Sequence, residues 1–194
     1  MTTAPDLAAA LEAALAALAA SEVALLAERH AARHDPLTGA LNRLGGLEEL
    51  AVLERPFALA MIDVDHFREV NRLPGSHATG DRVLCEIVEL LQGRPGDLLI
   101  RWGGEELLLA LAHTDVDGAG ARLLRFLGAV RAQVQAGHLS VTFSAGVAEV
   151  TDGVSVGDAI AAADAALARA KAEGRARVVT ASPWSVAPDL RSTG

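Results

Sequence analysis

Residues 97–112 read DLLIRWGGEELLLALA, two apolar runs separated by a pair of glycines and a pair of glutamates. Apolar runs on both sides of Gly-Gly are typical of a β-hairpin, so we expect two antiparallel strands joined by a two-residue turn. Two like charges pressed together cannot both stay ionised without a counter-charge. The stretch therefore predicts a sheet and, at its turn, a site formed by Glu105 and Glu106.

The segments around this hairpin predict an α+β fold. The apolar run FALAMIDVD (57–65) is typical of a buried strand that ends in carboxylates. The other expected elements are helices over 43–54, 81–93, 115–136 and 156–174 and strands over 138–150 and 175–181. The order strand, helix, hairpin, helix, strand predicts a ferredoxin-like βαββαβ core, with an antiparallel-containing sheet flanked by helices.

A long helix is predicted ahead of this core. Its apolar residues follow steps of four, three and seven, at Leu11, Leu15, Leu18 and Leu25. That heptad-like spacing favours a coiled coil, and the alternative is an amphipathic helix packed on its own domain. Pro36 and Gly39 then break the helix. We expect a signalling or dimerisation helix over 1–34, a catalytic domain over 35–181 and a flexible tail over 182–194.

Composition limits the classes of partner. The chain has 194 residues, with 25 Asp and Glu against 17 Lys and Arg, a net charge of −8. That acidic balance disfavours tight binding of DNA through its phosphates. The single cysteine excludes an internal disulfide framework. No apolar run is long enough to span a bilayer, so we expect a cytoplasmic protein without membrane insertion.

Carboxylates are expected to converge where the first strand and the hairpin turn meet. Asp63 and Asp65 end the first strand, and Glu105 and Glu106 follow the two glycines. A few hard oxygen ligands suit Mg²⁺, which keeps its remaining positions for water and substrate phosphates. The residues therefore predict a phosphoryl-transfer site, whereas an Asp pair alone is more often a solvated rim.

Six segments along the chain resemble the GGDEF family, the diguanylate cyclases. RWGGEEL (101–107) resembles the signature GG(D/E)EF. The other matching segments, in chain order, are DPLTGALNR (35–43), IDVDHFREVN (62–71), SHATGDRVL (76–84), VTFSAGVA (141–148) and ADAALARAKAEGRARV (163–178). The resemblance implies a nucleotide-cyclase palm that condenses two GTP into cyclic di-GMP. It also implies a homodimer in which each subunit presents one GTP.

The resemblance assigns the acidic residues to metal and catalysis. Asp63, the carbonyl of Val64, Glu105 and Glu106 would bind Mg²⁺, with Mn²⁺ as a substitute. Glu105 would also help to deprotonate the attacking 3′-hydroxyl, and we expect it to carry more of the catalysis than Glu106. Arg68, where the family usually has lysine, would offset charge that develops on the phosphate.

Substrate contacts are likewise implied by the resemblance. Asn71 and Asp81 would read guanine, and Gly103 and Gly104 would lie against the nucleotide. A carboxylate accepts two N–H bonds from guanine but meets an acceptor in adenine, so Asp81 suits guanine; its alternative role is a helix N-cap. Lys171 and Arg175, four apart on one predicted helix face, would clamp the phosphates. Their alternative role is to complement the helix C-terminus.

A second ligand site is implied by the RxxD sequence Arg94-Pro-Gly-Asp97, where family members bind product and are inhibited. Arg125 aligns with a secondary arginine of that inhibitory site. Pro-Gly is also an ordinary type II turn.

The chain departs from the family in three places. Leu107 replaces phenylalanine, Arg72 replaces an acidic residue, and the segment between Asn71 and Asp81 is one residue longer. We expect a homodimeric diguanylate cyclase, joined through its N-terminal helix to an upstream sensory domain or partner. The alternative is a GTP or cyclic di-GMP receptor without turnover; cyclisation of another nucleotide fits Asp81 less well.

Overall fold

A mixed sheet forms the centre of the protein. The computed structural model describes residues 4–73 and 76–181. In spatial order the strands are β1 (Leu41–Asn42), β3 (Leu98–Arg101), β4 (Glu106–Ala112), β2 (Phe57–Val64), β7 (Phe143–Val150) and β8 (Val178–Thr180). β2 runs antiparallel to β4 and β7, and β3 runs antiparallel to β4. These four strands confirm the predicted ferredoxin-like α+β core, to which β1 and β8 add parallel edges.

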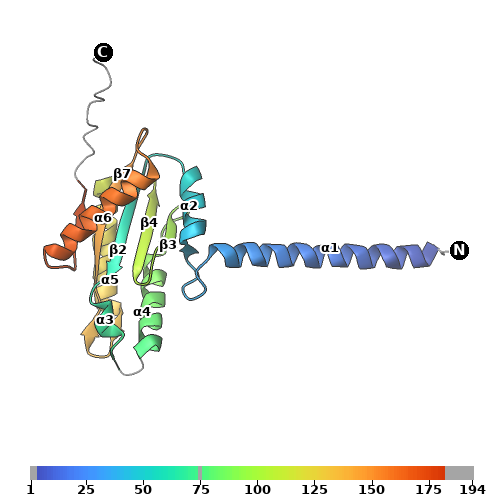
Figure 1. Cartoon of the computed structure of the whole chain (residues 1–194), viewed down its shortest axis with the longest axis horizontal. Helices are drawn as coiled ribbons and strands as arrows, with labels where there is room; N and C mark the ends of the chain where they lie inside the picture. The colour runs from blue at the N-terminus through green and yellow to red at the C-terminus, as the bar shows by residue number, and fades with distance from the viewer. Residues whose placement is uncertain (1–3, 74–75, 182–194) are drawn as a thin grey trace, which may run out of the picture.

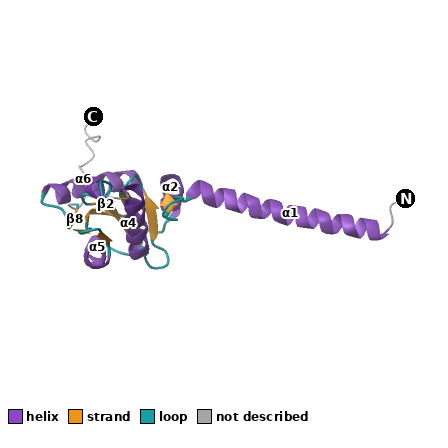
Figure 2. Ribbon diagram, turned by 90° about the horizontal axis from the view of Figure 1, so that it is seen from below, coloured by secondary structure: helices purple, strands orange, loops and turns teal. Residues whose placement is uncertain are grey.

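Helices cover both faces of this sheet (Figures 1 and 2). α2 (Arg43–Val52) and α6 (Val156–Ala172) pack on one face. α4 (Ser76–Leu91), α5 (Val116–Gln133) and the short α3 (Phe67–Val70) pack on the other. β2 alternates between the two faces, with Leu59 and Met61 in one core and Ala60 and Ile62 in the other. A strand buried on both faces needs the continuous apolar run that its sequence has.

Gly146 brings α6 close to β7. A Cβ at this position would collide with the backbone of α6 at Ala163 and Leu167. The absence of a side chain therefore lets the helix lie directly on the strand. This close contact fixes the height of α6 along the sheet, and with it the position of Lys171 near the helix end.

The N-terminal helix α1 (Ala4–Arg33) extends away from the sheet (Figure 1). Its predicted seam is exposed: the exposed fractions of Leu11, Leu15, Leu18 and Leu25 are 61%, 57%, 59% and 47%. The alternative that this seam packs on its own domain is therefore wrong. The last turn is anchored to the domain, because Arg33 pairs with Glu48 and Glu49 of α2. No helix in the described part of the chain is long and apolar enough to cross a bilayer.

Several element boundaries differ from those expected. The strand expected over 138–150 begins at Phe143, because β5 (Gln135–Ala136) and β6 (Leu139–Ser140) form a separate hairpin around the left-handed Gly137. α4 begins at Ser76, five residues before Asp81, so Asp81 is not its N-cap. The expected tail over 182–194 lies outside the described residues.

Candidate active site

The β3–β4 turn is wider than the two residues expected. Arg101 and Leu107 form the last strand pair, and the amides of Trp102 and Gly103 both donate to the carbonyl of Glu106, at 2.9 and 3.2 Å. Because one carbonyl holds two successive amides, the chain reverses over Gly103–Glu105 instead of over Gly103-Gly104 alone. The hairpin itself is confirmed, and its turn lies at the end of β2.

Two carboxylates meet at this end of the sheet. Asp63 of β2 lies directly opposite Glu106 of β4 in the strand register. The Nζ of Lys171 lies 2.8 Å from Oδ2 of Asp63, and 14% of the Asp63 side chain is exposed. Like charges directly opposite on a sheet repel each other, so the lysine supplies a counter-charge that the pair requires. The structure thus brings Asp63, Glu106 and Lys171 together.

Glu105 and Val64 lie beside this pair. The amide of Val64 donates to the carbonyl of Glu105 at 3.3 Å, which holds the turn against the end of β2. Glu105 and Glu106 are both half-buried. Glu106, for which the smaller catalytic role is expected, is the residue directly opposite Asp63 in the strand register.

The two glycines of the turn serve different needs. A Cβ on Gly103 would lie 2.7 Å from Oε2 of Glu106, so any side chain there would displace the carboxylate. Gly104 is exposed, with open space where a Cβ would stand. Gly103 therefore makes room for Glu106, and Gly104 leaves room for a ligand.

Asp65 does not join the acidic edge. Its side chain is buried, with 4% of the residue exposed. It accepts hydrogen bonds from the hydroxyls of Thr142 and Ser144, at 2.8 and 2.7 Å, and from the amide of Ala176, at 3.0 Å. The expectation that Asp65 converges with the other carboxylates is therefore wrong, because donors from β7 and from the turn after α6 surround it.

Lys171 and Arg175 do not share a helix face. α6 ends at Ala172, and Arg175 and Ala176 follow in left-handed conformation, with φ of 62° and 47°. The amide of Arg175 donates to the carbonyl of Ala170 at 3.0 Å. Left-handed backbone costs a non-glycine residue roughly 1–2 kcal/mol and persists where surrounding contacts hold it. Arg175 therefore stands on a turn that the rest of the site must stabilise.

Asn71 and Asp81, the expected guanine readers, come from adjacent places in the fold. Asn71 follows the last turn of α3, and its side chain lies against Gly80, where a Cβ would collide with Oδ1 of Asn71. Asp81 is the next residue and is exposed on α4. Arg68, in the last turn of α3, is exposed as well. Gly80 thus allows the longer segment before it to keep Asn71 and Asp81 close together.

The RxxD segment forms a tightly held turn. The amide of Asp97 donates to the carbonyl of Arg94, and the Asp97 carboxylate accepts from the amides of Arg94 and Ala112. The arginine that contacts Asp97 is Arg122, at 2.5 Å, and 2% of the Asp97 side chain is exposed. Arg125 lies about one helical turn further along α5 and is exposed. The expected role of Arg125 in the inhibitory site therefore stays a prediction.

Arg101 links the turn to the start of the domain. Its Nε and Nη2 donate to the carbonyl of Gly104, and its Nη1 donates to both oxygens of Asp35, at 2.9 and 3.1 Å. Burial alone would raise the pKa of Asp35, but hydrogen bonds from Thr38 and Arg101, together with the Arg101 charge, lower it below its ordinary value. Asp35 begins the segment DPLTGALNR, and Arg101 begins RWGGEEL, both of which resemble family motifs. The sequence does not predict that the two residues pair, and the available signal was that each is the first residue of its motif.

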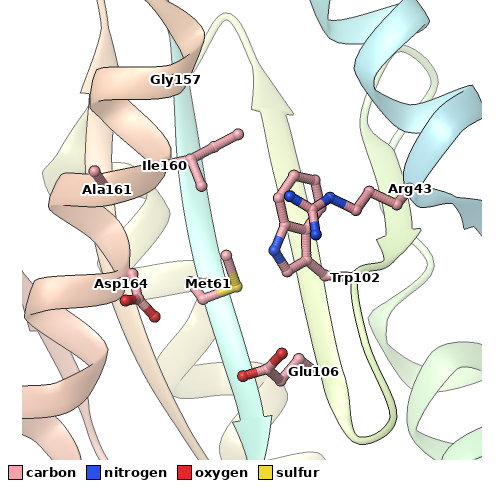
Figure 3. Close-up of a pocket in the computed structure, with 8 residues that line it drawn as sticks. All are labelled: Arg43, Met61, Trp102, Glu106, Gly157, Ile160, Ala161 and Asp164. Carbon is pink, nitrogen blue, oxygen red and sulfur yellow. The ribbon is translucent and has the colours of Figure 1, made fainter.

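A pocket of about 290 Å³ opens beside Glu106 (Figure 3). It lies between α2 and α6, and Arg43, Trp102 and Asp164 contribute to its lining. The guanidinium of Arg43 lies over the Trp102 ring, 4.3 Å from its centroid. The pocket adds a cation and a further carboxylate next to the acidic pair.

The donor set of the site fits a hard divalent cation. Within the described ranges, no group of three or more His, Cys, Asp and Glu side chains is placed to hold a metal. Asp63, Glu106 and the neighbouring Glu105 offer carboxylate oxygens, and the carbonyl of Val64, the last residue of β2, is expected to join them. Mg²⁺ is commonly held by one or two carboxylates plus water and substrate phosphates, so a small set of this kind matches it.

The fold and the acidic end of its sheet define a nucleotide-cyclase palm. The family model described as "Diguanylate cyclase, GGDEF domain" matches residues 32–177. The chain belongs to the GGDEF family.

Two curated relatives show the extent of the similarity. Diguanylate cyclase DgcM of Escherichia coli (strain K12) is 39% identical over 166 residues, which cover 78% of this chain and 39% of that protein. Diguanylate cyclase DgcP of Pseudomonas aeruginosa is 36% identical over 167 residues, which cover 79% of this chain and 25% of that protein. The chain thus spans well under half the length of these relatives.

Solved structures extend the similarity to the N-terminal helix. The coiled coil and GGDEF domain of DgcB from Caulobacter crescentus, in complex with c-di-GMP, matches with a TM-score of 0.83 and 28% identity, covering 90% of this chain and 99% of that one. Diguanylate cyclase SiaD of Pseudomonas aeruginosa, in complex with its activator SiaC, matches with a TM-score of 0.69 and 39% identity, covering 90% and 72%. A coiled-coil helix followed by a cyclase palm is therefore the architecture of this chain.

Proposed function

We propose that the protein is a diguanylate cyclase that condenses two GTP into cyclic di-GMP and releases pyrophosphate. The observation that carries the proposal is the pairing of Asp63 with Glu106 across β2 and β4, with Lys171 2.8 Å from Asp63. A carboxylate pair held beside a lysine and an open glycine turn is suited to polyphosphate and a divalent cation.

Each part of the site takes one task in the reaction. Asp63, the Val64 carbonyl, Glu105 and Glu106 hold Mg²⁺, or Mn²⁺ in its place. When bound, the metal lowers the charge on the phosphates and stabilises the attacking and leaving oxygens. Glu105 accepts the proton of the 3′-hydroxyl; its half-buried position in the turn, next to exposed Gly104, supports this role.

The remaining contacts bind and orient GTP. Asn71 and Asp81 bind guanine, and Gly103 and Gly104 lie against the nucleotide. Arg68, Lys171 and Arg175 hold the phosphates as cations. In the absence of nucleotide, Lys171 neutralises Asp63 instead. The lysine therefore exchanges one anionic partner for another when substrate and metal enter.

Two copies of the chain must face each other, since each subunit presents one GTP. The exposed seam Leu11, Leu15, Leu18 and Leu25 of α1 supplies the contact, as residues 1–34 form the dimerisation helix and 35–181 the catalytic domain. The similarity of α1 and the palm to the coiled coil and GGDEF domain of DgcB supports this arrangement. SiaD binds an activator, which supports an upstream partner for the helix here as well. The use of GTP, a nucleotide of the cytoplasm, supports a cytoplasmic location for the protein.

Product inhibition through Arg94 and Asp97 is the finer part of the proposal. DgcB and this chain share the fold, and DgcB was solved in complex with c-di-GMP. Because Asp97 is sealed by Arg122, the exposed Arg94 makes the greater contribution to binding product.

The test is to incubate the protein with GTP and Mg²⁺ and to separate the nucleotide products. Cyclic di-GMP should form, and its rate per molecule should rise with protein concentration, because the active form is a dimer. Glu105→Gln is the matched control, since it removes the charge and keeps the shape. No cyclic di-GMP above this control would contradict an enzyme, and bound cyclic di-GMP without synthesis would identify a receptor.

A further inference from the structure

Asp65 is the carboxylate of the site that the proposed reaction leaves unused. It lies two residues after Asp63, yet only 4% of it is exposed. Oδ2 accepts from the Thr142 hydroxyl and the Ala176 amide, and Oδ1 accepts from the Ser144 hydroxyl. A buried carboxylate whose oxygens are occupied by three donors is poorly placed to bind a metal in addition.

These contacts join three segments that lie far apart in the sequence. The backbone amide of Asp65 also donates to the carbonyl of Thr142, at 2.9 Å, so three hydrogen bonds of Asp65 join the end of β2 to the start of β7. The amide of Ala145 in β7 donates to the carbonyl of Arg177, at 2.9 Å. Asp65, Thr142, Ser144 and the Ala176 amide therefore form one unit, which we call the Asp65 bracket.

The bracket ends on the strained turn that carries Arg175. Gly174, Arg175 and Ala176 have φ of 110°, 62° and 47°, so three successive residues are left-handed. Such a conformation persists only where contacts determine it. The Ala170 carbonyl holds the amide of Arg175, and Asp65 holds the amide of Ala176. The backbone amides of Arg175 and Ala176 are thus both held by hydrogen bonds, which fixes the backbone from which the Arg175 side chain extends.

We infer that Asp65 is a positioning residue that holds the left-handed turn and so aims Arg175 at the phosphates of GTP. The inference rests on the proposed function, in which Arg175 binds those phosphates. In that role the buried Asp65 acts as a hydrogen-bond acceptor. Asp63, in contrast, acts through its charge at the end of β2, beside Lys171. Two carboxylates of one short segment therefore have separate tasks.

The two roles respond differently to an isosteric amide. The amide oxygen of Asn can replace Oδ2 and accept from Thr142 and Ala176, while its NH₂ group donates to Ser144. Asp65→Asn should therefore keep the bracket, and Asp65→Ala should lose it. A metal ligand would instead be lost in both variants, because neutral amides bind Mg²⁺ poorly compared with carboxylates.

The binding test compares two nucleotides that differ only in their phosphates. Titration calorimetry of the full chain with 3′-deoxy-GTP and 3′-deoxy-GMP, in Mg²⁺, avoids turnover because the attacking hydroxyl is missing. Asp65→Ala should weaken 3′-deoxy-GTP about tenfold, the scale of one charge-assisted contact, and leave 3′-deoxy-GMP unchanged. Asp65→Asn should stay within about threefold of wild type for both. Arg175→Ala should match Asp65→Ala, and the double variant should lose no more than either alone.

Controls separate positioning from general destabilisation. Thr142→Val removes one donor of the bracket and Thr142→Ser restores the hydroxyl, so this pair tests the same contact if Asp65→Ala fails to fold. Asp115→Ala removes the N-cap of α5, where Asp115 accepts from Gly118. It should lower stability without changing the preference for triphosphate over monophosphate.

Hydrogen exchange at the Ala176 amide reads the bracket directly. In Asp65→Ala this amide should exchange at least about tenfold faster than in wild type, and in Asp65→Asn it should stay protected. Unchanged exchange together with an unchanged preference for triphosphate would overturn the inference. Loss of Mg²⁺-dependent binding in Asp65→Asn would identify a metal ligand instead. If wild type binds no 3′-deoxy-GTP, the proposed function fails, and exchange then decides alone whether Asp65 holds the turn.

Discussion

The β3–β4 hairpin has acidic groups at both ends, and the two ends differ in how far these groups are buried and paired within the protein. At the start of β3, Asp97 is sealed: its oxygens accept from two backbone amides and from Arg122, and 2% of its side chain is exposed. At the turn, Glu105 and Glu106 stay half-buried beside exposed Gly104, and Glu106 lines a pocket (Figure 3).

The difference separates structural from ligand-binding acids. Removing a sealed carboxylate destabilises the fold, because its buried partner Arg122 is then left without a counter-charge. An open pair such as Asp63 and Glu106 costs stability because like charges lie opposite each other, and the ion pair of Lys171 with Asp63 offsets part of that cost. We therefore expect substitutions at the turn to change activity, and substitutions at the Asp97 end to change stability.

The strongest test of this comparison is Glu106→Gln. It should lower the rate of cyclic di-GMP synthesis about 100- to 1,000-fold, the scale of losing a charged group that acts on the reacting phosphate. The free energy of unfolding should stay the same or rise, because repulsion with Asp63 is relieved. Rates from product separation and unfolding by urea measure the two effects. A clear loss of stability with activity retained would make Glu106 a structural acid.

Lys171→Met tests the cation of the same end. Lys171 neutralises Asp63 without ligand and is expected to bind phosphate with it, so synthesis should fall about 50-fold, mostly through a higher KM. Arg169→Met is the matched control, because Arg169 is an exposed cation two residues earlier on α6. An equal loss in both variants would show that the general positive charge of α6 is responsible, and not the contact with Asp63.

Sequence reasoning predicted the parts of the molecule that follow from local pattern. The order of elements follows from periodicity and turn residues, and it brings the end of β2 beside the hairpin turn. The sequence pattern alone therefore predicts that Asp63 and Glu106 lie together, and the strand register confirms it. α4, by contrast, begins at Ser76, five residues earlier than expected, because Gly75 and Gly80 favour a turn in the sequence although Gly80 lies within the helix.

The details that sequence reasoning missed depend on distant partners. Asp65 and Asp63 look equivalent in the sequence, and only the hydroxyls of β7 and the turn after α6 distinguish them. The left-handed turn at Arg175 contradicts the helical pattern of its neighbours and depends on the same contacts. Arg122 and Arg125 are one helical turn apart, so only packing decides which of them reaches Asp97.

At the sealed end, Asp97→Asn should cost about 2 kcal/mol of unfolding free energy. The variant keeps the shape but leaves Arg122 as a buried charge and weakens two bonds to backbone amides. Arg94→Ala should leave stability unchanged, because Arg94 is exposed, and should relieve inhibition by added cyclic di-GMP. Urea unfolding and inhibition curves of both variants would separate the fold-stabilising half of RxxD from its ligand-binding half. Equal stability of Asp97→Asn and wild type would contradict the sealed role.

The smallest expected effect concerns Asp35, which ties Arg101 and the Gly104 carbonyl to the start of the domain. Because its folded-state pKa lies below the ordinary 3.8, the ionised carboxylate stabilises the fold fully above that value, and the contribution is lost as the pH falls through the lower folded-state pKa. Asp35→Asn should therefore be less stable than wild type at pH 7, by about 1 kcal/mol, and the difference should shrink below pH 4. Urea unfolding at pH 7, 5, 4 and 3 measures it, with Asp115→Asn as a control acid at an exposed helix cap. A difference that stays constant with pH would show that the two acceptor oxygens of Asp35, and not its charge, hold Arg101 on the turn.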